Sequence, residues 1–244
     1  MGKVTRWDHV VKRLRWGEDT LAIVILFVMT MLPFLASITR VLNISSIPAS
    51  QVLVQHCTLW IGFLGAVLAA RQNKLLALTR EPLFKKEEGF HFGKWIAKVT
   101  TFLVLVALSW GSWELVKVEI QYPIDIAPNI PRWFAQFIMP VGFGLMAVQV
   151  YSNSYVKPIQ RVTLIIIGLI FSISAIPEMI FDVLPVVPIG ILIIIIALLH
   201  GAPIFVGLGG AAILFFWADY TPISAIPAEA YRIVVSPTLP TIPL

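Results

Sequence analysis

The feature that most constrains this chain is a run of 36 residues, from 183 to 218, that contains no Asp, Glu, Lys or Arg. As one helix it would be ~54 Å long, well beyond the ~30 Å hydrocarbon core of a bilayer. A Gly-Ala-Pro sequence at 201–203 divides the run. We therefore predict two membrane-spanning helices here, at residues 184–199 and 203–217.

The composition extends this interpretation to the whole chain. Of the 244 residues, 58% are hydrophobic and only 13% are charged, against about 25% charged residues in typical soluble domains. The mean hydropathy is +0.88. A soluble fold of this length could not bury so much apolar surface, and the continuous apolar runs lack the alternation of a β-barrel. The predicted fold class is therefore all-α integral membrane.

Five further apolar stretches are long enough to span a bilayer, which gives about seven transmembrane helices. Asp19 and Arg40 bound the first, and Pro33 is expected to kink it. The residues before it form either an amphipathic helix lying on an anionic leaflet or a plain charged tail. The five predicted spans are residues 20–39, 50–70, 95–116, 131–151 and 162–180.

The basic residues predict the orientation of these helices. Segments 1–19, 71–98 and 152–161 hold 14 of the 18 Lys and Arg residues. The positive-inside rule then places the N-terminus and the 71–98 loop in the cytoplasm of a multi-pass inner-membrane protein. The same loops account for the net charge of +5, so we do not expect a nucleic-acid partner.

No catalytic, cofactor-binding or metal-ligating constellation is predicted. His56 falls toward the outer end of its span and His200 at the inner end of another, while the other two histidines fall in inner segments. No pair at matching depth could hold a haem, so packing or hydrogen bonding is the expected role. The lone Cys57 excludes an intrachain disulfide. Glu114 and Lys117 are one turn apart and so could pair; both fall near the outer surface, where a solvated setting is expected.

Small residues spaced four apart predict a helix-packing face in the second span, because they let another helix approach closely. On this prediction Val67 lies on a different face, where a leucine should be tolerated. The glycine run at 207–210 does not follow a strand, so it is assigned to helix packing rather than to phosphate binding. The packing candidates are Trp60, Gly62, Gly65, Ala66 and Ala69.

Four stretches, in order, resemble the permease of TRAP transporters (tripartite ATP-independent periplasmic transporters). Residues 59–71 resemble the second helix of the Q-type small subunit, an aromatic-rich helix ending in Leu-Gly-Ala…Ala-x-Arg, and residues 131–143 resemble its fourth helix. Residues 198–205 are similar to the Gly-x-Pro entry of the M-type large subunit, and residues 236–244 to the stretch before its first re-entrant hairpin. The chain departs from the family where glutamines replace frequent acidic residues, at Gln51 and Gln55.

The resemblance implies a small-subunit domain over residues 1–157, a connector helix over 158–182 and the truncated start of a large-subunit domain over 183–244. It implies a scaffold within a sodium-driven, secondary active transporter for organic acids such as carboxylates. Sites for substrate and sodium are then expected in re-entrant hairpins beyond Leu244. The implied partners are the rest of the large permease domain, a periplasmic binding protein and membrane lipid.

Two other functions stay open on the sequence. A membrane anchor subunit of a redox or other enzyme complex would also consist of apolar helices, although the histidine positions argue against haem. A small multi-span enzyme is the other possibility, and no catalytic pair in the sequence supports it.

Overall fold

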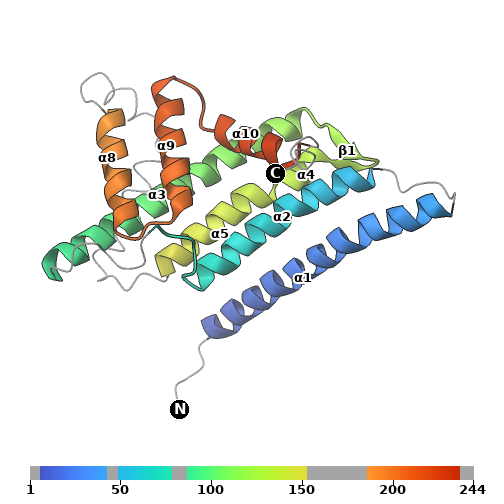
Figure 1. The fold of residues 1–244 in the computed structure, drawn as a ribbon, viewed down its shortest axis with the longest axis horizontal. Helices are drawn as coiled ribbons and strands as arrows, with labels where there is room; N and C mark the ends of the chain where they lie inside the picture. The colour runs from blue at the N-terminus through green and yellow to red at the C-terminus, as the bar shows by residue number, and fades with distance from the viewer. Residues whose placement is uncertain (1–5, 43–48, 79–86, 153–185, 237–244) are drawn as a thin grey trace, which may run out of the picture.

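The computed structural model describes residues 6–42, 49–78, 87–152 and 186–236 (Figure 1). Within these ranges four helical stretches are long and apolar enough to cross a membrane, and two shorter apolar helices follow. The all-α membrane fold predicted from the sequence is confirmed. The four long stretches are Trp16–Val41, Ser50–Arg71, Gly93–Gln121 and Arg132–Ser152.

The first helices are longer than their predicted spans. Helix α1, Arg6–Val41, continues without interruption through the segment expected to be an amphipathic helix or a tail. Helix α2, Ser50–Arg71, matches its predicted bounds to within one residue. Helix α3, Glu87–Gln121, extends well beyond residues 95–116 at both ends, because an α-helix can continue into water once its apolar part has crossed the membrane.

The predicted fourth span is divided into α4, Arg132–Gln136, and α5, Ile138–Ser152. Between them, the backbone N–H of Phe137 donates to the carbonyl of Trp133, 2.9 Å away. Pro140 has no N–H to donate to the carbonyl of Gln136, four residues earlier, which accounts for the interruption at this place.

The uncharged run forms α8, Val186–Leu199, and α9, Ile204–Ala218. The predicted break is confirmed, and Gly201 at the turn adopts φ 94°, a conformation that favours glycine. The turn is held against the segment after α2, because the N–H of Ile204 donates to the carbonyl of Leu76 at 2.8 Å. The turn therefore lies at the same end of the bundle as the start of the 71–98 loop.

Two elements were not predicted. Helix α10, Ala225–Val234, is short and amphipathic. Strands β1, Asp125–Ala127, and β2, Ile130–Pro131, form a small antiparallel hairpin. Pro128 and Asn129 form the turn between the two strands. Asn129 adopts φ 63°, as position i+2 of a type II turn requires.

Helix α3 is the central element of the packing. It lies against α5 on one side, while α8, α9 and α10 pack on another (Figure 1). The contact with α9 is close: a Cβ added to Gly210 would lie 3.2 Å from Val104 of α3 and 2.9 Å from Ile194 of α8. The packing role predicted for the glycine run at 207–210 is confirmed.

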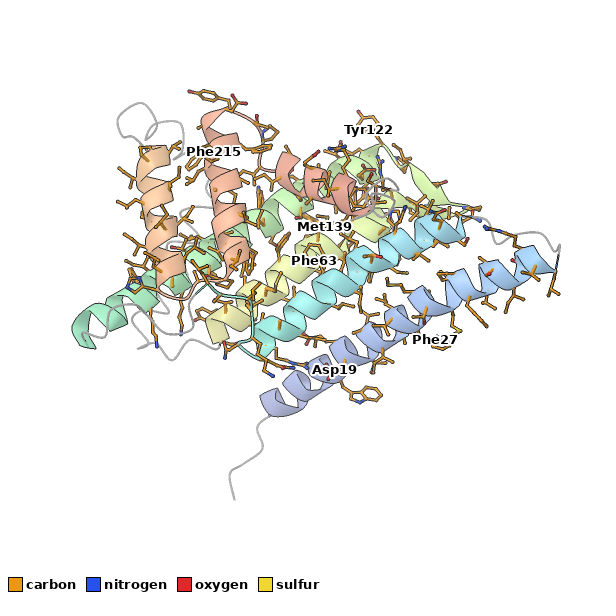
Figure 2. All side chains as sticks on the ribbon, viewed as in Figure 1. Asp19, Phe27, Phe63, Tyr122, Met139 and Phe215 are labelled. Atoms are coloured by element: carbon orange, nitrogen blue, oxygen red, sulfur yellow. The ribbon has the colours of Figure 1, made fainter. Side chains whose placement is uncertain are left out.

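Helix α1 packs against α2 and presents much of its apolar surface outward. Phe27, labelled in Figure 2, is 60% exposed, whereas Phe63 and Met139 pack in one cluster between α2 and α5. Such an apolar outer face is suited to contact with lipid tails, because exposing it to water would cost free energy.

The predicted span at 162–180, and with it the connector at 158–182, lies outside the described residues. The domain boundaries at 157 and 183 therefore remain predictions.

Candidate functional site

The structure places the predicted packing residues of α2 in different surroundings. The indole Nε1 of Trp60 donates to the carbonyl of Ala135 at 3.0 Å, and its ring lies 5.8 Å from that of Phe134. Trp60 therefore faces α4, as predicted. Ala66 packs at the edge of the cluster that contains Val67, and Ala69 is half-buried.

For Gly62 and Gly65 the prediction is wrong within the described part of the chain. Both are exposed, and a Cβ added to either would meet no atom within 4 Å. The tight approach occurs instead on α5, where a Cβ at Gly142 would lie 2.6 Å from Phe63. Val67, assigned to a tolerant face, is 1% exposed. Helix α2 is apolar on all sides, so periodicity could not indicate which face packs.

Ion pairs fasten α1 to α2 at one end of the bundle. The Arg71 guanidinium lies 3.1 Å from Glu18 and 2.8 Å from Asp19. Asp19 of α1 is seen in Figure 2 beside the C-terminal end of α2. The sequence alone indicates only that Asp19 bounds the first span. Arg71 lies 53 residues from Glu18 and 52 from Asp19, so no short-range spacing indicates these pairs.

A second set of ion pairs lies at the opposite end. Glu114 and Lys117 pair at 2.8 Å with both side chains well exposed, which confirms the predicted solvated pair. Glu119, in the last turn of α3, pairs with Arg132 at the start of α4 at 2.7 Å. This second pair was not predicted, and it closes the loop that contains the β-hairpin.

His56 is buried and hydrogen-bonded at both ring nitrogens. Nδ1 lies 2.7 Å from the carbonyl of Val52, and Nε2 lies 2.7 Å from the hydroxyl of Tyr231. Because a carbonyl can only accept, Nδ1 carries the proton and Nε2 accepts from the phenol. The predicted hydrogen-bonding role is thus confirmed. Burial raises the pKa of Tyr231 to about 12, which keeps this phenol protonated at physiological pH.

His200 lies at the other end of the bundle, in the turn between α8 and α9. Its Nδ1 lies 2.8 Å from the carbonyl of Ile196, and the ring packs on Gly93 of α3, where a Cβ would be 1.9 Å away. His56 and His200 are therefore at opposite ends and cannot hold one haem between them.

A cavity of about 500 Å³ lies beside the His56–Tyr231 pair. Its polar groups are on α2, the β-hairpin, α4 and α10, and both arginines are already paired, Arg132 with Glu119 and Arg232 with Glu229. Among the described residues no group of three or more His, Cys, Asp or Glu could hold a metal. The arrangement joins helices and offers a polar surface. The polar lining comprises Gln51, Gln55, His56, Asp125, Arg132, Tyr231 and Arg232.

Fold and site together define a multi-span membrane component whose polar side chains fasten helices at the two ends of the bundle. Comparison with known families identifies it further. Residues 29–161 match the family described as the DctQ component of tripartite ATP-independent periplasmic transporters. The chain belongs to this family, and is therefore a multi-pass protein of the bacterial inner membrane with a role in TRAP transport rather than an enzyme.

One curated relative extends the match beyond the small subunit. The isethionate TRAP transporter permease protein DctMQ of Oleidesulfovibrio alaskensis is 26% identical over 200 residues, which is 80% of this chain and 31% of the relative. The chain thus spans about a third of that relative's length. Together the two matches support a Q-type subunit fused to an M-type start.

Proposed function

We propose that this chain is the membrane scaffold of a sodium-driven permease that imports organic acids delivered by a periplasmic binding protein. The family membership supports the transport role. The relative is named for isethionate, an organic acid, which supports an organic anion as the substrate class. No feature of the described residues favours an anchor for a redox complex, and the transporter family argues against it.

The observation that carries the scaffold role is the position of α3. This helix lies within the DctQ match and packs against α5, yet α8, α9 and α10 from the proposed large-subunit start pack on it as well. A helix in close contact with both parts would make them one rigid body. We propose residues 1–157 as the small-subunit domain, 158–182 as the connector and 183–244 as the start of the large-subunit domain.

Substrate and sodium sites belong, on this proposal, to the large-subunit portion beyond Leu244. Sites of this kind use broken helices whose ends point at the bound ions. The ion pairs of this chain lie instead near helix ends, where they fasten α1 to α2 and α3 to α4. The end of the bundle at the β-hairpin, whose loop is closed by the Glu119–Arg132 pair, is our candidate contact for the binding protein.

Proteoliposome transport tests this function. The complete permease that contains this chain, with its binding protein, should accumulate a radiolabelled organic acid when a sodium gradient is imposed. A potassium gradient should not replace sodium, and residues 1–244 alone should show no uptake above empty vesicles. Sodium-dependent uptake by residues 1–244 alone would place the transport site within this chain and contradict the scaffold role.

A further inference from the structure

The groove between α3 and α5 is an apolar cavity of about 490 Å³ that opens on the outer surface of the bundle. Its lining is almost wholly apolar and aromatic, and several of its residues are exposed, Val148 by 61% and Trp110 by 53%. Helices α8 and α9 contact α3 elsewhere: α9 packs on Val104 and Leu108, and α8 packs on Ala97. None of these three residues lines the groove. Its principal lining residues are Phe102, Val106, Trp110, Trp113, Val141 and Val148.

The floor of the groove is small and has its polar group satisfied. Gly144 and Ala147 of α5 leave the space open, and the hydroxyl of Ser109 donates to the carbonyl of Pro140 at 2.9 Å. The hydroxyl of the floor therefore already has a hydrogen-bond partner and does not need a water molecule. A hydrocarbon chain can lie in such a groove without breaking a hydrogen bond.

The length of the groove matches one leaflet. From Phe102 to Trp113 the helix α3 advances by ~16 Å, against ~15 Å for half of a bilayer's hydrocarbon core. An aromatic pair borders each end: the rings of Phe102 and Tyr151 lie 6.3 Å apart at the deep end, and those of Trp113 and Phe137 lie 6.3 Å apart at the shallow end.

Charges of both signs lie one turn beyond the shallow end. The Lys117 ammonium is 5.4 Å from the centre of the Trp110 ring, which lines the groove, and 2.8 Å from the Glu114 carboxylate. Both side chains are well exposed, by 44% and 39%, so each has further bonding capacity. A cation and an anion side by side complement a headgroup that also carries both charges, and they would repel part of a purely anionic one.

We propose that this groove binds one acyl chain of a phospholipid with a phosphoethanolamine headgroup, in the leaflet that contains Lys117. The phosphate contacts Lys117, and the primary ammonium donates to Glu114. The site does not depend on the substrate proposed above, and it assigns a specific lipid to a surface that would otherwise be a nonspecific membrane contact.

Native mass spectrometry of the purified protein, with added phosphatidylethanolamine, phosphatidylcholine or phosphatidylglycerol, tests the site. We expect one phosphatidylethanolamine to be retained per chain, with a roughly tenfold preference over phosphatidylglycerol, which equals about 1.4 kcal/mol. Phosphatidylcholine, whose quaternary ammonium cannot donate, should bind more weakly than phosphatidylethanolamine. Equal retention of the three lipids would overturn the proposal.

Two variants separate the groove from the headgroup site. Val148→Trp should fill the groove from its exposed rim and abolish retention, whereas Leu208→Trp, at a position that is 73% exposed on α9, should leave it unchanged. Glu114→Ala should remove the lipid preference, because only the contact of the ammonium with this carboxylate distinguishes the three headgroups, while Glu229→Ala, in a similar exposed pair on α10, should not. Unchanged retention in Val148→Trp, or a photocrosslink from position 148 to protein instead of lipid, would contradict the proposal.

Discussion

The hydroxyl of Tyr231 lies 2.7 Å from Nε2 of His56, so a hydrogen bond joins residues 175 positions apart. The bond links α10 to α2 and is buried from solvent, with His56 5% and Tyr231 8% exposed. It therefore fixes the helix that follows α9 against the DctQ part of the chain.

We predict that Tyr231→Phe lowers the free energy of unfolding by about 1–2 kcal/mol, because the buried Nε2 loses its donor. Chemical unfolding in detergent micelles would measure the change. The matched control is Tyr220→Phe at a phenol that is 86% exposed, where we expect no resolvable effect. Equal stability of both variants would show that the bond does not contribute.

A second prediction concerns the contact between α3 and the turn at His200. Gly93→Ala should destabilise the protein by about 1–3 kcal/mol, because the new methyl group displaces the half-buried ring of His200 from its contact with α3. Thermal unfolding of the variant should show the loss, and His200→Ala in the same protein should restore much of it. The control, Gly62→Ala, adds a methyl group to open space and should be neutral or slightly stabilising. The contact is refuted if Gly93→Ala behaves like this control.

The packing face of α2 gives a third prediction. Val67→Leu should destabilise by about 1–3 kcal/mol, since it enlarges a side chain in a filled core. Gly65→Leu should be tolerated, because its added side chain points into open space. This is the reverse of what the small-residue pattern predicted. Unfolding of the two variants, compared in one detergent, decides between the two faces.

The orientation of the chain remains a prediction from its basic residues. In a Cys57→Ala background, single cysteines at Lys86 and Asp125 should react with an impermeant maleimide from opposite sides of the membrane. The loop at Lys86 should be labelled only after the cells are opened, because positively charged loops stay in the cytoplasm. Labelling of both positions in intact cells would contradict the assignment.

Features that depend on runs of apolar residues, or on spacing within one helical turn, could be predicted from the sequence. The break before Pro203, the bounds of α2 and the local pair of Glu114 with Lys117 all follow from composition or from spacing within one turn. The remaining features depend on tertiary contacts. Arg71 with Glu18, and His56 with Tyr231, join distant residues, and their pairing cannot be read from either neighbourhood.

The face of α2 shows the same limit within a single helix. Bilayer-facing and core-facing residues are both apolar, so Gly65 and Val67 could not be told apart by hydrophobicity. The hairpin at Asn129 is different, because its Pro-Asn turn signal was present in the sequence and could have been used.

The most direct test of the scaffold claim is a crosslink between α3 and α9. A Cβ at Gly210 would lie 3.2 Å from Cγ2 of Val104, so Val104→Cys with Gly210→Cys, in a Cys57→Ala background, should form a disulfide on oxidation. If both helices belong to one rigid scaffold, sodium-dependent uptake by the complete permease should be the same before and after oxidation. Uptake that is lost on oxidation and regained on reduction would show that α3 and α9 move against each other during transport, and would contradict the account.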